Sequence, residues 1–135
     1  MANGIKRNRL EIQLSGLDIY NFSVTKVPDS IRELLDYSDT RMEDYRYFIF
    51  HQANKLILET IRKKLAIAPE KVPYSISKYG NTSSASIPLT IVSEIRNEIT
   101  TKPLTMLLSG FGVGFSWGVV ALKTRMPVCP PVIEI

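Results

Sequence analysis

The order of hydrophobic and polar positions predicts strands and helices that alternate along most of the chain. Strands are indicated where β-branched and aromatic residues alternate or form short apolar runs, and helices where apolar residues recur every three or four positions. These patterns predict strands at 18–27, 45–50 and 72–76, a helix that Pro28 introduces and that continues to Ser38, a helix at 54–67, a helix that begins near Ser84 to Ser86 and reaches Ile99, and a hairpin with apolar runs at 104–109 and 115–123.

Prolines help to place the helix ends. A proline inside a helix costs ~3 kcal/mol unless it lies in the first turn. We therefore place Pro28 at the start of its helix, and we start the helix that contains Pro88 late enough for Pro88 to fall in its first turn. Pro69 lies just beyond the predicted end of the helix at 54–67.

Strand–helix alternation followed by a terminal hairpin predicts an α/β layered fold, with a mixed sheet flanked by helices. Both hairpin runs are apolar enough to predict that both strands are buried. Residues 1–13 are polar and irregular, and we expect them to be frayed or to follow a missing upstream region. Three prolines in residues 124–135 argue against a regular element there. The predicted domain therefore spans residues 14–123.

The composition of the chain mainly excludes certain classes of protein, such as membrane-spanning and secreted proteins. The chain has 135 residues, 44% of them hydrophobic and 22% charged, which is ordinary for one globular domain. Its net charge of +4 suits an acidic partner, but surface lysines without a function explain the charge equally well. No run approaches the ~18 apolar residues of a membrane span, and the N-terminus lacks the apolar core of a signal peptide. We therefore expect a cytoplasmic protein without a membrane or nucleic-acid partner.

Three polar or glycine-rich loops are candidates for chemistry: 51–54 (His-Gln-Ala-Asn), 80–82 (Gly-Asn-Thr) and 110–114 (Gly-Phe-Gly-Val-Gly). Each follows a predicted strand at its carboxyl end, so the three could converge at one edge of the sheet. A histidine, an asparagine amide and close backbone N–H groups can together stabilise a developing negative charge. Each loop also has an ordinary structural explanation, as a polar residue at the core edge, a turn with a helix cap, and a hairpin turn.

These segments resemble a known family. HQAN at 51–54, YGNTSSASIPL at 79–89 and SGFGVGFSWG at 109–118 are similar, in order and in spacing, to the C-terminal signatures of β-ketoacyl-acyl-carrier-protein synthase III, a condensing enzyme of the thiolase superfamily. The resemblance extends from about Leu14 to Lys123. It implies a layered thiolase-like half with a mixed sheet, flanking helices and a final β-hairpin.

The resemblance also implies catalytic roles. His51 and Asn81 match two members of a Cys-His-Asn triad that decarboxylates malonyl-carrier protein and stabilises the enolate that attacks an acyl thioester. A neutral histidine suits this role, and the apolar strand before it favours the neutral form by desolvation. Phe111, Gly112 and Val113 match the loop that lines the pantetheine channel and supplies a backbone N–H to the acyl oxyanion. Val113 departs from the family's run of three glycines, so its side chain is expected to narrow the cleft or to alter the backbone angle there.

Binding positions follow by the same resemblance. Gly16 and Asn54 match positions near the pantetheine arm. Lys63 and Lys64 match basic positions proposed to contact the acidic carrier protein, with Arg62 assisting. The alternative for these cations is a solvated helix face on which Glu59 pairs with Lys63. The implied substrates and partners are coenzyme A and acyl-carrier-protein thioesters, and neither a cofactor nor a metal is implied.

The triad's cysteine has no match in this chain. Cys129, the single cysteine, follows the last strand and has no helix after it to activate the thiol, so we do not expect it to be the nucleophile. The chain is then an excised C-terminal domain, which we favour, a natural half-protein that pairs with a separate N-terminal subunit, a specialised synthase with another acyl product, or a non-catalytic module that binds carrier protein or coenzyme A. A lone half would expose an apolar face, which predicts self-association or pairing with an N-terminal half.

Overall fold

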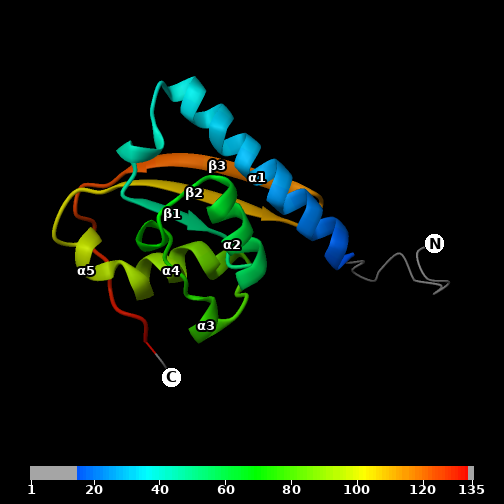
Figure 1. The fold of residues 1–135 in the computed structure, drawn as a ribbon. Coiled ribbons are helices and arrows are strands. Elements are labelled where there is room, and N and C mark those ends of the chain that lie inside the picture. The colour runs from blue at the N-terminus through cyan, green and yellow to red at the C-terminus, as the bar shows by residue number, and fades with distance from the viewer. Residues whose placement is uncertain (1–14, 134–135) are drawn as a thin grey trace.

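The computed structural model describes residues 15–133, in which helices cover both faces of a three-stranded sheet (Figure 1). The strands are β1 (Tyr47–Phe50), β2 (Thr105–Gly112) and β3 (Ser116–Lys123). The helices are α1 (Gly16–Ser38), α2 (Lys55–Lys64), α3 (Ile76–Tyr79), α4 (Ser86–Glu94) and α5 (Arg96–Ile99), and single 3-10 turns lie at Met42–Asp44, Pro69–Lys71 and Ser83–Ala85.

The sheet is mixed, with strand order β1-β2-β3. β1 and β2 are parallel, with Phe50 opposite Ser109, and β2 and β3 form an antiparallel hairpin, with Phe111 opposite Trp117. The predicted mixed sheet, the strand at 45–50 and the final hairpin are therefore confirmed. Gly110 and Gly112 lie inside β2, however, so only the segment 113–115 forms the turn.

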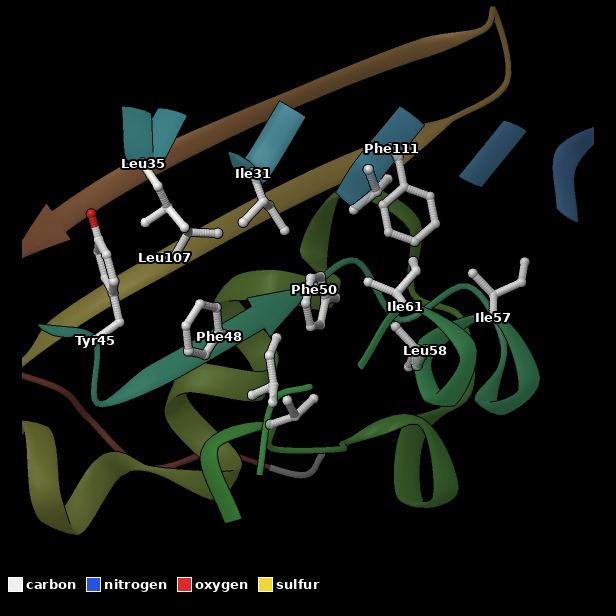
Figure 2. Close-up of a cluster of buried hydrophobic side chains, with 13 residues drawn as sticks. Ile31, Leu35, Tyr45, Phe48, Phe50, Ile57, Leu58, Ile61, Leu107 and Phe111 are labelled. Carbon is white, nitrogen blue, oxygen red and sulfur yellow. The ribbon is translucent and has the colours of Figure 1, made fainter. Parts of the chain in front are cut away.

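The larger core lies between the sheet and the helices α1 and α2. Figure 2 shows Phe48 and Phe50 of β1 and Leu107 of β2 facing side chains of these two helices. The other buried members of this cluster are Val27, Ile31, Leu35, Tyr45, Ile57, Leu58, Ile61, Ile67, Val72 and Phe111. On the opposite face, Tyr47, Ile49 and Met106 pack against Ile95 and Ile99 near α5. The alternation of inward directions along β1 accounts for its burial on both faces, and the layered α/β prediction is confirmed.

The prediction of a strand at 18–27 is wrong, because these residues belong to the 23-residue helix α1. Val24, Val27, Ile31 and Leu35 recur at three- and four-residue spacing and form one buried stripe along the helix. The β-branched residues that suggested a strand are tolerated because that stripe packs on the sheet. Tertiary packing therefore outweighs local propensity here.

Pro28 lies inside α1 instead of at its start. A proline has no N–H to donate to the carbonyl four residues earlier, which in this helix is the carbonyl of Val24. The ammonium Nζ of Lys64, on α2, donates to that carbonyl at 2.9 Å. The replacement donor explains how the helix continues through the proline.

The predicted strand at 72–76 is also absent. The backbone N–H groups of Ser75 and Ile76 both donate to the side-chain Oε1 of Gln52, at 3.1 and 3.2 Å, so they are not available to a strand ladder. Ile76 instead begins the short helix α3. The helix predicted from Ser84–Ser86 to Ile99 does begin at Ser86, but it breaks at Ile95 into α4 and α5.

The expected burial of both hairpin strands holds for β2 only. β3 is the edge strand, and nearly all of its residues are exposed. Phe115 in the turn and Trp117 in β3 pack on Phe22 of α1. On the other side of the strand, Val120 and Leu122 remain 56% and 39% exposed. The segment 124–133, predicted to be irregular, contains no helix or strand. The other segment predicted to be irregular, residues 1–13, lies outside the described residues.

Candidate functional site

Five of the residues singled out in the sequence line one cleft of about 740 Å³: His51, Asn81, Phe111, Gly112 and Val113. The remaining lining residues are Ser83, Ser84, Ser86, Ile87 and Gly110. The three candidate loops therefore do converge. Sequence reasoning did not single out the serines as site residues, although they belong to the segment 79–89 that carries the family resemblance.

His51 follows β1 directly and is held by both neighbouring elements. Its backbone N–H donates to the Ser109 carbonyl at 2.8 Å and so continues the pairing between β1 and β2. Its ring Nδ1 lies 2.7 Å from the hydroxyl of Ser86, and the ring of Phe111 packs edge-on against it, with 5.4 Å between the ring centres. Within residues 15–133 no side chain forms a hydrogen bond with the other ring nitrogen, Nε2, and the backbone of Ser83 is the remaining polar neighbour of the ring.

The electrostatic setting of His51 favours the uncharged ring. Burial lowers the pKa of His51 below its ordinary value, and the nearby backbone of Ser83 raises the pKa in partial compensation. The imidazole is therefore mostly neutral at neutral pH. This agrees with the neutral histidine expected after an apolar strand.

Asn81 reaches the cleft from a loop and not from the end of a strand, contrary to our expectation. The chain leaves α3 through Gly80, whose φ of 68° suits glycine. The Asn81 side-chain oxygen then accepts the N–H of Ser83 at 3.0 Å, a local turn that orients the side chain. Its amide nitrogen makes only a long contact of 3.5 Å with the Ala53 carbonyl. Its N–H groups thus remain available to a ligand.

The hairpin supplies the third wall of the cleft. Phe111 is buried near the end of β2, whereas Val113 stands in the turn with 57% of its surface exposed. The φ of Val113 is not positive, so the valine requires no conformation that favours glycine. Its effect on the cleft is therefore the volume of its side chain.

Gln52 anchors the cleft from behind and was not predicted as a functional residue. Its side chain is fully buried and donates to the Phe50 carbonyl at 2.9 Å, while its oxygen accepts the N–H groups of Ser75 and Ile76, at the start of α3. It therefore joins the end of β1 to the segment that leads to Asn81. A polar residue directly after an apolar strand is the sequence signal that could have found it.

Two predicted pantetheine positions lie outside the lining of the cleft. Asn54 caps α2, where its side-chain oxygen accepts the N–H of Ile57 at 2.8 Å. Gly16 is the exposed first residue of α1, which Ser15 caps. The structure thus assigns Asn54 a role in the fold, and the part of either residue in ligand binding stays a prediction.

The three predicted docking cations of α2 differ in their surroundings. Arg62 is held by Glu59 at 2.8 Å and by the Ile67 carbonyl at 2.9 Å, and Lys64 is bound to Val24. Lys63 is exposed and makes no hydrogen bond or ion pair with residues 15–133. The pairing of Glu59 with Lys63, which belonged to the alternative interpretation, is absent from the described residues, because Glu59 contacts Arg62 instead and also accepts the Tyr74 hydroxyl at 2.6 Å.

Other site types find no support in the described part of the chain. Residues 15–133 hold no cluster of three or more His, Cys, Asp or Glu side chains that could bind a metal, and none of their helices has the length and apolar character to span a membrane. Cys129 packs near α4 and α5, where its carbonyl accepts a hydrogen bond from Arg96 at 2.7 Å. It does not line the cleft.

Comparisons with known proteins agree on one relationship. The family model for the C-terminal domain of 3-oxoacyl-[acyl-carrier-protein] synthase III matches residues 35–124. The chain is 39% identical over 107 residues to a β-ketoacyl-[acyl-carrier-protein] synthase III of Acaryochloris marina, covering 79% of this chain and 32% of the relative. It is 36% identical over 119 residues to one of Staphylococcus epidermidis, covering 88% and 38%. The chain thus spans about a third of the length of the curated relatives it matches.

Solved structures give the same result. The 3-oxoacyl-(acyl-carrier protein) synthase of Burkholderia xenovorans superposes with a TM-score of 0.81 at 39% identity, over 84% of this chain and 32% of that one. The synthase III of Pseudomonas aeruginosa superposes with a TM-score of 0.78 at 34% identity, over 94% and 40%. The fold, the motifs in the cleft and these matches lead to one conclusion: the chain belongs to the family of 3-oxoacyl-[acyl-carrier-protein] synthase III C-terminal domains.

Proposed function

We propose that this chain is the C-terminal half of a condensing acyltransferase and that it supplies the histidine and asparagine of a Cys-His-Asn site. The reaction is the decarboxylative condensation of an acyl thioester with malonyl-carrier protein. The observation that carries the proposal is that His51 and Asn81, thirty positions apart, line one cleft with Phe111, Gly112 and Val113.

The geometry suits the chemistry of decarboxylation. Loss of carbon dioxide from a malonyl thioester leaves negative charge on the thioester oxygen, and neutral donors aimed at that oxygen lower the barrier. His51 is neutral, no side chain among residues 15–133 forms a hydrogen bond with its Nε2, and the Asn81 amide has N–H groups to spare. Two donors from different walls of one cleft can therefore share one oxygen.

The acyl acceptor belongs to a part of the enzyme that this chain does not supply. Cys129 stands outside the cleft, in the segment 124–133, which contains no helix. The nucleophilic cysteine is therefore assigned to an N-terminal half, and the chain by itself does not turn over. The uncovered side of β3, with Val120 and Leu122, is the place where that half or a second copy packs.

The substrates are thioesters of coenzyme A and of acyl-carrier protein, and the reaction needs no cofactor. Lys63 is the cation best placed to meet the acidic carrier protein, because Arg62 and Lys64 are engaged within the fold. Gly16 and Asn54 lie at the starts of α1 and α2, where the pantetheine arm would pass. The cytoplasm is the compartment that this chemistry implies.

The test uses the chain joined to an N-terminal half that carries the cysteine. Release of carbon dioxide from malonyl-carrier protein and formation of the ketoacyl product are measured for the parent and for His51→Ala and Asn81→Ala. Each variant should lose ~10²–10³-fold in rate, the usual effect of removing one such donor. Asn97→Ala, an exposed change outside the cleft, is the control. Full rate in both cleft variants would refute the assignment.

The second candidate is a non-catalytic module that binds carrier protein or coenzyme A. The observation that favours it is that no cysteine among the described residues lines the cleft. Such a module should bind holo-acyl-carrier protein with unchanged affinity after His51→Ala, and the completed protein should release no carbon dioxide. Calorimetric titration and the decarboxylation assay together separate the two functions.

A further inference from the structure

We propose that residues 125–133 form a lid that opens and closes over the sheet face next to α5, and that Arg96 is the latch of this lid. The family model matches the chain only as far as residue 124, so the lid follows the matched domain. Figure 1 shows this segment, in red, leaving the end of β3 and passing α5. The inference does not depend on the proposed function.

The sequence of the lid favours an extended backbone. Pro127, Pro130 and Pro131 each hold φ at roughly −65° and have no N–H to give to a helix or a strand ladder. Met126, directly before them, has a φ of 48°, in the left-handed region, which interrupts the extended course of β3. An extended proline-rich chain has about three residues per turn, so side chains three positions apart lie on the same face.

Two side chains on one face attach the lid to the domain. Cys129 and Val132, three positions apart, are half-buried, and the other residues of 125–133 are exposed. Cys129 packs against the smaller hydrophobic cluster, whose buried members are Tyr47, Ile49, Ile95, Ile99, Leu104 and Met106. Pro131 and Val132 form one wall of a hollow of about 450 Å³, and the other walls come mainly from α4 and α5. The lid therefore covers part of the cluster and closes one side of the hollow.

One hydrogen bond holds the lid down. Nε of Arg96, the first residue of α5, donates to the Cys129 carbonyl at 2.7 Å. It is the only hydrogen bond between residues 125–133 and the rest of the described chain. A guanidinium donor makes a stronger hydrogen bond than a neutral group does. The start of the lid is fixed independently, because the Thr124 N–H donates to the Leu104 carbonyl at 2.8 Å.

These attachments are few enough for the lid to open without unfolding of the domain. A segment opens by itself when few buried contacts and few hydrogen bonds hold it. Beyond Thr124 the lid has one hydrogen bond and two half-buried side chains, whereas β2 and β3 are paired along their whole length. Opening would turn the hollow into an open groove and uncover the smaller cluster, while the sheet stays paired.

The thiol of Cys129 reports the opening, because the chain contains no other cysteine. The full chain is mixed with excess dithiobis(nitrobenzoic acid). The Cys129 thiolate attacks the disulfide of the reagent, a mixed disulfide forms on the protein, and the coloured thiolate that leaves is recorded. When closing is faster than labelling, the labelling rate is proportional to the open fraction. We expect the folded chain to react more slowly than the urea-unfolded chain, and equal rates would overturn the inference.

Variants of Arg96 test the latch. Arg96→Met keeps an apolar stem but removes the donor, and it should raise the labelling rate ~10–100-fold, the effect of losing one hydrogen bond from a charged group. Arg96→Lys, which keeps a cationic donor, should restore slow labelling. Arg32→Met removes the same charge from an exposed ion pair on α1 and should keep the parent rate. An unchanged rate in Arg96→Met would overturn the role of the latch.

A second control separates opening of the lid from unfolding of the domain. Lys64→Met removes a hydrogen bond between α2 and α1, on the opposite face of the sheet. Global unfolding exposes a large surface and is therefore strongly promoted by urea. We expect labelling to keep the parent rate in Lys64→Met and to depend little on low urea concentrations. If both accelerate labelling as Arg96→Met does, the lid does not open by itself and the inference fails. The urea dependence is measured on the parent chain, so it tests the lid even if Arg96→Met does not fold.

Discussion

Lys64 on α2 donates a hydrogen bond of 2.9 Å to the Val24 carbonyl, the group that Pro28 leaves without its helical partner. A lysine that the family resemblance assigned to carrier-protein docking thus completes the hydrogen bonding of the neighbouring helix α1. The two adjacent lysines of α2 therefore differ in role: Lys64 stabilises the fold, and Lys63 remains the candidate for carrier-protein docking.

Replacing Lys64 should therefore destabilise the fold. We expect Lys64→Met to lower the free energy of unfolding by ~1–3 kcal/mol, because the partly buried carbonyl of Val24 loses its donor. Urea unfolding followed by circular dichroism measures the change. Lys63→Met, at the exposed neighbouring position, is the control and should be close to neutral.

The proline provides a second check of the same relationship. In a Pro28→Ala background the backbone N–H at position 28 can donate to Val24, so the cost of Lys64→Met should shrink. Equal costs in the two backgrounds would contradict the explanation. The comparison is a double-mutant cycle, which isolates the coupling between the two positions.

Carrier-protein docking should depend on Lys63. Lys63→Glu should weaken the affinity for acyl-carrier protein and reduce its dependence on salt, with the unfolding free energy unchanged, because the side chain is exposed and unpaired among the described residues. Titration at two ionic strengths measures both effects. Lys26→Glu on α1 changes the net charge equally at another exposed position, so a similar loss there would leave only a general charge effect.

Acid should destabilise the protein through two glutamates. The Arg46 guanidinium, the Tyr47 hydroxyl and Lys102 hold the pKa of Glu98 at about 2, and Arg62 and the Tyr74 hydroxyl hold that of Glu59 at about 2, against an ordinary 4.5. A carboxyl with a depressed folded-state pKa stabilises the fold above its unfolded pKa, and this contribution is lost as the pH falls. Stability should therefore fall as the pH drops from about 4.5 toward about 2.

Glu98→Gln and Glu59→Gln should each flatten this decline. The measurement is the urea unfolding free energy at several pH values across the acid range. Asp29→Asn is the control, because Asp29 forms only an exposed ion pair with Arg32, on the surface of α1. An acid decline that stays as steep in the double glutamine variant would show that other groups control it.

Self-association should depend on the uncovered side of β3. Val120→Lys combined with Leu122→Lys should lower the sedimentation coefficient of the chain at high concentration, because two apolar side chains that an edge strand presents are replaced by charges. Val128→Lys, at a position 96% exposed outside the sheet, is the control. A chain that remains monomeric with and without the β3 changes would contradict the proposed contact.

The elements that could be predicted from the sequence are those in which one local pattern dominates. β1 is a short apolar run, and the β2–β3 hairpin has two such runs around a turn with glycines. α2 has a clear apolar stripe, an asparagine cap and a proline after its end. In these segments local preference and tertiary packing agree, which is why the predictions were confirmed.

The errors come from interactions between distant residues. The strand predicted at 18–27 is a helix that continues through Pro28 because a lysine forty positions away replaces the missing donor. The strand predicted at 72–76 is absent because the Gln52 side chain takes two of its N–H groups. Exposure of β3 reflects its place at the sheet edge. None of these contacts can be read from the local sequence.

The same distinction applies to the candidate site. The motifs identified His51, Asn81 and the loop at 111–113, and the fold brings them to one cleft. Ser86 and Gln52 were not singled out, because their importance lies in a contact between a helix start and a strand end and in a buried side chain that bridges two segments. Residue type was enough to suggest His51 and Asn81 as site residues. The residues that hold this site in place, Ser86 and Gln52, are recognised only from their contacts in the folded structure.

The hydrogen bond from the His51 backbone to Ser109 has a mechanical consequence. It fastens the histidine wall and the hairpin wall of the cleft to two neighbouring strands of one sheet, so these two walls move together. Asn81 stands on the remaining wall, a loop outside the sheet, and its own side chain reaches the histidine wall only by a contact of 3.5 Å with the Ala53 carbonyl. Under the proposed function, we therefore expect thioesters of different bulk to be accommodated at the loop from Gly80 to Ala85, because the other two walls keep their spacing.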